Sequence, residues 1–132
     1  MGVVRLKDHL LEAYADLKED RLDECYKKVV FLADEMTEEP FLYYVLGSYY
    51  SKIEQFGMSI LAYEKALHLR ENFSEAHNNI GGAYRKLGFQ EKALKSFERA
   101  IELGRGEEFV KHNGEKLPPS DRDWETPSRK RE

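Results

Sequence analysis

The sequence has one cysteine and no long run of apolar residues, and each scarcity excludes a class of protein. A single cysteine, Cys25, cannot form an internal disulfide, which suits a reducing compartment and leads us to expect a cytoplasmic protein. The longest apolar runs are far shorter than the ~18 to 20 residues that span a bilayer, and the N-terminus lacks the apolar core of a secretory signal. We therefore expect no disulfide framework and no membrane attachment.

The chain also lacks an excess of positive charge, because its 21 Lys and Arg residues are outnumbered by 25 Asp and Glu residues, which gives a net charge of -4. A basic surplus is what holds a polyanion, so we expect no nucleic-acid partner. The four histidines are scattered and lack the spacing of metal ligands. No Gly-rich phosphate loop, nucleophile elbow or Ser/His/Asp constellation occurs. We predict no enzymatic activity, no metal and no cofactor.

The chain does contain an internal repeat with a period of 34 residues. Shifting the sequence by 34 places aligns small on small and large on large residues: Ile80, Gly81, Tyr84, Phe97, Ala100 and Leu103 fall on Leu46, Gly47, Tyr50, Tyr63, Ala66 and Leu69. A period of this length is typical of a helical-hairpin repeat that buries its apolar face by stacking on a neighbour. Gly47 and Gly81 fall where a Cβ would hold paired helices apart.

The stretch 74–103 resembles the tetratricopeptide repeat family. The family's signature positions hold Ile80, Gly81, Tyr84, Gly88, Ala93, Phe97 and Ala100, and His77 stands where Trp is usual. The preceding repeat keeps Tyr43, Leu46, Gly47, Tyr50, Tyr63 and Ala66, but Glu54 and Ser59 replace the preferred Gly and Ala. The resemblance implies an all-α fold, a right-handed superhelical solenoid of antiparallel helix pairs, that serves as a non-enzymatic protein-protein interaction module.

Taken in order, the chain predicts a repeat domain over residues 1–112 and a polar, Pro-rich tail over 113–132. We expect three repeats, the first diverged, and a short capping helix after Gly104 and Gly106 end the last long helix. The expected bounds are about 4–36, 40–70 and 74–104 for the repeats and 106–112 for the capping segment.

The first repeat aligns less cleanly than the other two. Its Cys25 and Val29 precede Ser59 and Tyr63 by 34 residues, whereas Tyr14 precedes Tyr50 by 36. We therefore expect the connection inside the first repeat to be about two residues longer. Asp20 and Ser74 are candidate N-caps of the helices that follow them.

In the resembled family, the first helices of successive repeats line a concave groove that holds a peptide or a partner's helix. Carried over residue by residue, that groove is lined by Phe41, Tyr44, Val45, Ser48 and Lys52, by Glu75, Asn78, Asn79, Arg85 and Lys86, and by Asp8, His9 and Glu12 of the first repeat. It is expected to be acidic at one end, aromatic in the middle and basic at the other. The clamp with which some members hold a C-terminal carboxylate is absent, because its positions in the first and third repeats hold Asp8, Glu12, Glu75 and Asn79, and Val45 replaces the Asn of the second.

The tail carries the only tryptophan, Trp124, among Asp121, Asp123 and Glu125. A tryptophan in a polar segment is a candidate anchor for a partner, for this chain's own groove or for a neighbouring copy, which would give self-association. Two alternatives to groove binding stay open. The chain can be a structural subunit of a larger assembly, held by its flanks and tail, or a detached regulatory module of an enzyme.

Overall fold

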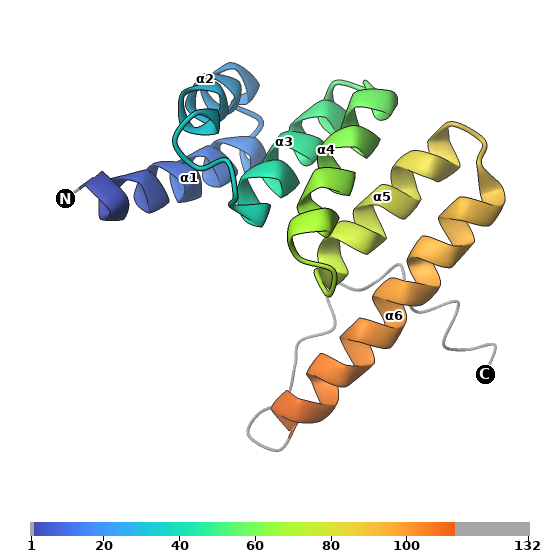
Figure 1. Ribbon diagram of the computed structural model, residues 1–132. Helices are drawn as coiled ribbons and strands as arrows, with labels where there is room; N and C mark the ends of the chain where they lie inside the picture. The colour runs from blue at the N-terminus through green and yellow to red at the C-terminus, as the bar shows by residue number, and fades with distance from the viewer. Residues whose placement is uncertain (1, 113–132) are drawn as a thin grey trace.

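The computed structural model describes residues 2–112, with side chains described for residues 6–105, and these residues form six helices in three consecutive pairs. The pairs are α1 (Gly2–Lys18) with α2 (Leu22–Ala33), α3 (Pro40–Lys52) with α4 (Phe56–Leu69), and α5 (Ser74–Lys86) with α6 (Gln90–His112). Figure 1 shows the pairs stacked one after another along the chain. The predicted all-α solenoid of helix pairs is confirmed.

The 34-residue period holds through all three pairs. The second helices begin at residues 22, 56 and 90, and the first helices end at residues 18, 52 and 86. The prediction of a longer connection in the first repeat is therefore wrong. When the three repeats are aligned at a constant spacing of 34 residues, which we call the strict register, Asp16 and not Tyr14 occupies the position of Tyr50 and Tyr84. A buried, ion-paired carboxylate thus replaces the aromatic ring in the first repeat.

The turn between the two helices of each pair contains one residue in the left-handed region at the same repeat position. These residues are Asp20 with φ 65°, Glu54 with φ 62° and Gly88 with φ 88°. Asp20 therefore ends α1 and does not cap α2, which Arg21 precedes without a side-chain cap. Ser74 is not an N-cap either, because it lies inside α5 and is buried.

In the second and third repeats, the first helix contacts the loop before it through the side chain at the repeat's large-aromatic position. The Tyr43 hydroxyl donates to the Thr37 carbonyl oxygen at 2.9 Å, and Nε2 of His77 lies 2.9 Å from the Glu71 carbonyl oxygen. Because these two contacts are 34 residues apart, His77 makes in the third repeat the same contact with the preceding loop that Tyr43 makes in the second.

Two glycines let the helices of the later pairs cross closely. A Cβ on Gly47 would lie 2.7 Å from Cδ1 of Tyr63, and one on Gly81 would lie 2.8 Å from Cε1 of Phe97. The predicted role of these glycines is confirmed. In the first pair the corresponding residues are Ala13 and Val29, and the smaller Val leaves room for the methyl group of Ala.

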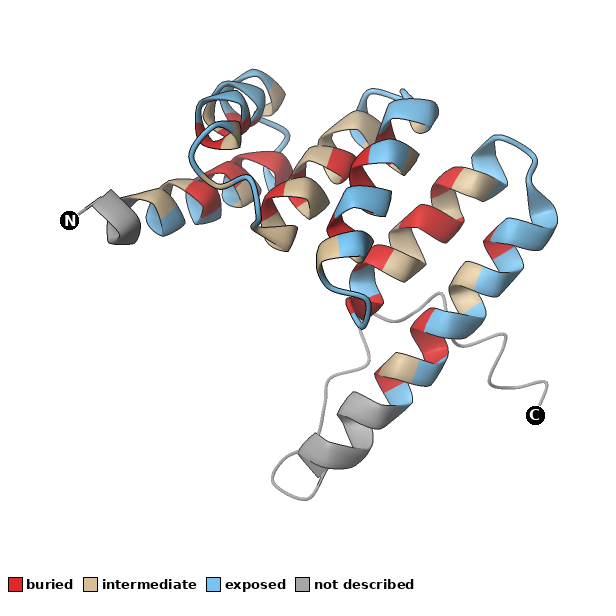
Figure 2. Cartoon of the chain, in the orientation of Figure 1, coloured by how far each residue is buried: buried red, intermediate tan, exposed pale blue. Residues whose placement is uncertain are grey.

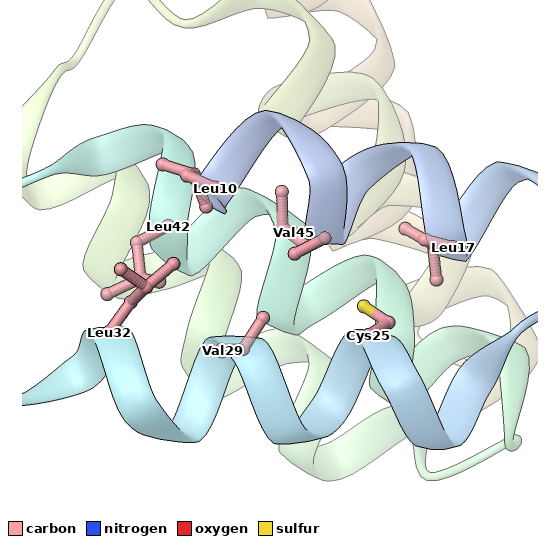
Figure 3. Packing of buried hydrophobic residues seen from close by; sticks show 8 residues of the cluster. Leu10, Leu17, Cys25, Val29, Leu32, Leu42 and Val45 are labelled. Atoms are coloured by element: carbon pink, nitrogen blue, oxygen red, sulfur yellow. The ribbon is translucent and has the colours of Figure 1, made fainter. Parts of the chain in front are cut away.

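Buried residues gather where neighbouring helices meet (Figure 2). Leu42 and Val45 of α3 point in among side chains of α1 and α2 (Figure 3), so the first pair completes its core with a helix of the next. Cys25 belongs to this core, and burial raises the pKa of its thiol to about 11, so it packs as a small apolar residue. A second cluster joins α4 to α5 through Tyr63, Ala66, Phe73, Ala76 and Ile80.

One carboxylate is buried beside this core. Asp16 is 4% exposed, and it accepts hydrogen bonds from Lys28 and from Nε of Arg21, the latter at 3.0 Å. The hydrogen bond from Lys28 and the one from Arg21 outweigh desolvation and hold the pKa of Asp16 below its ordinary value. These contacts join the end of α1 to the turn and to α2.

The last helix is longer than expected. α6 continues through Gly104 and Gly106 to His112, so neither glycine ends it and a separate capping helix is not formed. A glycine costs a helix interior only about 1 kcal/mol relative to alanine, which the packing of buried neighbours such as Ala100 and Ile101 can offset. The predicted tail, with Trp124, lies outside the described residues.

Among the described residues, no helix has the length and apolar character needed to cross a membrane.

Replacing the adjacent glycines of α5 should have opposite effects. A Cβ at Gly82 meets no atom within 4 Å, whereas one at Gly81 meets the Phe97 ring and, at 3.2 Å, the Ala93 carbonyl oxygen. We expect Gly81→Ala to lower the free energy of unfolding by about 1–3 kcal/mol through overpacking. Gly82→Ala should raise it by up to about 1 kcal/mol through helix propensity. Urea unfolding measures both, and equal changes would refute the crossing model.

Relieving the left-handed turn of the second repeat should stabilise the fold. A non-glycine residue in this region is disfavoured by roughly 1–2 kcal/mol, so Glu54→Gly should raise the free energy of unfolding by about 1 kcal/mol. Gly88→Ala should lower it by a similar amount. Thermal unfolding followed by circular dichroism checks the pair. Glu71→Gly, in a connection without positive φ, is the control and should give no gain.

Asp16 should make stability sensitive to acid. Its folded-state pKa lies below the ordinary value of 3.8, so its contribution is present above that value and is lost as the pH falls through the lowered pKa. We expect Asp16→Asn to lower the free energy of unfolding near neutral pH and to flatten its decline below about pH 4. Denaturant unfolding across this range tests it. The exposed Asp8→Asn should keep the wild-type slope, and an unchanged slope in Asp16→Asn would contradict the assignment.

Candidate functional site

A hollow of about 400 Å³ lies along α3 and α5, and we call it the basic hollow. Three cations line it, Lys52, Arg85 and Lys86, all of them exposed, and no acidic side chain among residues 6–105 does. Its other lining residues are Ser48, Ser51, Phe56, Tyr63, Asn78, Asn79, Gly82 and Phe97. The hollow thus combines an apolar wall with charge of one sign, which favours an anionic ligand.

A hydrogen-bond network spans the floor of the basic hollow. The Ser48 and Tyr63 hydroxyls lie 2.7 Å apart, and Nδ2 of Asn79 donates to the hydroxyl oxygens of Tyr63 at 3.3 Å and Tyr44 at 3.2 Å. Burial raises the pKa of Tyr63 to about 12 and also raises that of Tyr44, so both phenols stay neutral at physiological pH. The network ties α3, α4 and α5 together beneath the hollow.

Asn78, a residue that lines the basic hollow, has one polar atom without a partner among the described residues. Nδ2 of Asn78 donates to Oδ1 of Asn79 at 3.3 Å, but the Asn78 Oδ1 atom is buried without a hydrogen bond within the described part of the chain. A buried acceptor left unpaired costs about 1–3 kcal/mol. A ligand that brings an N–H group to this atom would recover that free energy.

The three cations at the rim make only weak interactions with other described residues. The Arg85 guanidinium lies 5.8 Å from the Phe97 ring centre, and Nζ of Lys52 lies 3.4 Å from Oδ1 of the exposed Asp20. Lys86 forms no ion pair with a described residue. Exposed ion pairs contribute little, so these charges are available to a ligand.

A second hollow, the aromatic hollow, lies where the first helix and the loop before α5 meet α3. It measures about 290 Å³ and is lined by Tyr14, Phe41, Tyr44, Arg70, Phe73 and Glu75. The Tyr44 ring stacks on Phe73 and Phe41 at centre distances of 5.0 Å and 5.7 Å. Tyr44 is therefore a packed part of the wall and not a free contact residue.

Most of the predicted groove residues line one of the two hollows: Ser48, Lys52, Asn78, Asn79, Arg85 and Lys86 line the first, and Phe41, Tyr44 and Glu75 line the second. Val45 was wrongly predicted, because its side chain is fully buried against the first pair. The first-repeat residues Asp8, His9 and Glu12 line neither hollow. His9 instead packs edge-on against Phe31 of α2.

The strict 34-residue register explains the wrong first-repeat residues and identifies two of the missed ones. It places Tyr14 and Gly82 at the repeat position of Ser48, and both line a hollow. The two-residue shift assumed for the first repeat concealed Tyr14. Phe56 and Phe97 come from the second helices, and Arg70 and Phe73 from a loop, so a search limited to first helices could not find them.

Within the described residues, no group of three or more His, Cys, Asp or Glu side chains is placed to hold a metal ion.

Comparison with solved structures shows the same fold in other proteins. A crystal structure of MamA is 24% identical, with 77% of this chain and 60% of that chain covered and a TM-score of 0.69. The second TPR of Spaghetti (RPAP3), bound to the HSP90 peptide SRMEEVD, is 18% identical, with coverages of 74% and 91% and a TM-score of 0.70. The chain thus spans about 60% of the MamA chain. Curated protein sequences gave no match.

Two models of the tetratricopeptide repeat match the chain, one over residues 42–73 and the other over residues 74–106. These matches adjoin one another and cover α3 to most of α6, in the register in which both repeats place a glycine under an aromatic ring. Such a family assignment supports a role in protein-protein interaction. The resemblance noted from the sequence is confirmed, and residues 42–106 of the chain consist of two tetratricopeptide repeats.

Proposed function

We propose that this protein is a non-enzymatic interaction module that binds an extended peptide, or an extended segment of a partner, along α3 and α5. The observation that carries the proposal is the basic hollow, where three cations surround an apolar wall and no carboxylate of the described residues opposes them. The two tetratricopeptide repeats support it, as does the HSP90 peptide bound by the similar RPAP3 domain. The expected cytoplasmic location stays a prediction.

The proposed ligand carries an acidic side chain. Arg85 presents two-pronged donors suited to a carboxylate, and Lys52 and Lys86 add positive charge on either side. The clamp for a terminal carboxylate is lacking, since Glu75 lies in the groove at one of its positions and repels a second carboxylate there. We therefore propose recognition of an internal acidic side chain in place of a chain end.

The length of the ligand follows from the spacing of the two hollows. Glu75 lines the aromatic hollow and Arg85 the basic hollow, and Arg85 follows Glu75 by ten positions on α5, a rise of about 15 Å. An extended peptide covers about 3.3 Å per residue, so about five residues bridge the two. A ligand with an acidic residue at one end and an apolar or basic residue at the other would match both.

Filling the basic hollow should abolish peptide binding without unfolding the protein. Gly82 lines the hollow, and a side chain added there meets open space, so Gly82→Leu places an isobutyl group where the ligand would lie. We expect at least a tenfold loss of affinity, about 1.4 kcal/mol, for peptides that the wild type selects from an immobilised random array. Fluorescence anisotropy with the selected peptides gives the affinities.

The matched control is Gly57→Leu, the same change at an exposed glycine of α4 with open space around it and no place in either hollow. It should leave affinity unchanged. A charge pair adds a second comparison: Lys86→Glu should weaken binding of acidic peptides, whereas Lys95→Glu on exposed α6 surface should not. Equal binding by Gly82→Leu and Gly57→Leu would exclude the groove as the binding site.

A further inference from the structure

The basic hollow specifies more about its ligand than a negative charge. The walls of the hollow suit an apolar group, since they include the rings of Phe56 and Phe97 and the backbone of Gly82. Because Gly82 has no side chain, the space in front of it stays open. A volume of about 400 Å³ is at the small end of ligand pockets, which span ~300–1,000 Å³. It suits one large side chain from a peptide, with the cations placed for charges beside that side chain.

The unpaired Asn78 Oδ1 narrows the choice further. A donor on a ligand can pair with this buried acceptor once the Asn78 amide turns toward the hollow, and that donor can be an N–H or an O–H. Among large aromatic side chains, tryptophan carries a ring N–H and tyrosine an O–H, whereas phenylalanine carries no donor. The hollow therefore fits a tryptophan flanked by carboxylates better than it fits phenylalanine or leucine in the same setting.

This chain contains one such segment. Its only tryptophan, Trp124, stands in the run Asp121, Arg122, Asp123, Trp124, Glu125, in which three carboxylates and one guanidinium give a net charge of -2. The charge is opposite to that of Lys52, Arg85 and Lys86 around the hollow. A Trp between acidic residues thus matches the apolar wall, the orphan acceptor and the cations together.

The chain is long enough for this segment to return to the hollow. Phe97 lines the hollow, and α6 carries the chain from there to His112, about 23 Å away at 1.5 Å per residue. Twelve further residues lead to Trp124, and an extended chain of that length reaches about 40 Å. The length of the chain therefore allows the return.

On the basis of the proposed groove function, we propose that residues 121–125 of this same chain bind in the basic hollow, with the Trp124 indole donating to Asn78 Oδ1. The segment then competes with any external peptide of the same kind. Because it is tethered, its effective concentration is in the millimolar range, so even weak docking lowers the affinity of the module for outside ligands.

The intrinsic fluorescence of the full chain tests this directly, since Trp124 is its only tryptophan. We expect the folded wild type to show blue-shifted emission and several-fold weaker quenching by acrylamide than a synthetic peptide of residues 115–132. Gly82→Leu should move both values to those of the peptide, whereas Gly57→Leu should leave them unchanged. Raised salt should weaken the docking, because exposed charges contribute to it.

Three outcomes would overturn the proposal. Emission of the wild type equal to that of the free peptide means that Trp124 is not docked. Shielded emission that Gly82→Leu does not alter places Trp124 elsewhere. A shift that depends on protein concentration makes a second copy the occupant, and sedimentation of the same samples identifies it.

A labelled peptide of residues 115–132, added to the full chain, separates this proposal from the proposed function. Trp124→Ala should bind the peptide more tightly than the wild type does, because the internal competitor is weakened. Equal binding by both overturns the internal docking. If array-selected peptides still lose affinity in Gly82→Leu, the groove function stands although the internal docking has failed.

Discussion

The close crossing of a glycine over an aromatic ring is the contact on which this structure depends. Gly47 faces Tyr63 and Gly81 faces Phe97 at distances that leave no room for a Cβ. Each ring thereby passes beneath the first helix of its pair, and both rings then reach the basic hollow on the other side. The same contact that packs the repeat supplies the floor and wall of the groove.

The chemistry of the groove follows from what surrounds those rings. Tyr63 is buried, but its hydroxyl is satisfied by Ser48 and Asn79, so the floor is polar without being charged. Asn78 beside it keeps one unpaired buried acceptor, an unfavourable state that a bound donor would relieve. Charge enters only at the rim, where all three side chains are cationic although the chain as a whole is acidic. The local field, and not the net charge, therefore sets which ligand is favoured.

The first helix pair shows how the repeat tolerates divergence. Ala13 and Val29 replace the glycine and the aromatic ring, and Asp16, paired with Lys28 and Arg21, replaces the tyrosine of the later repeats. Leu42 and Val45 of α3 still close its core. Because stacking on a neighbour supplies the missing contacts, the helix pair persists although the family match begins only at residue 42.

The sequence by itself determined the helix pairs, their 34-residue period and most of the first-helix residues that line the two hollows, because side-chain size at fixed spacing decides which helices can cross. It could not place Asp8, His9, Glu12 or Val45, since their exposure depends on the register and packing of the first pair. It also could not reveal that α6 continues through Gly104, because two glycines weaken a helix without ending it once its neighbours are packed. Only the tertiary structure brought Phe56, Gly82 and Phe97 to one hollow, because they come from three helices whose approach is set by packing across the repeat.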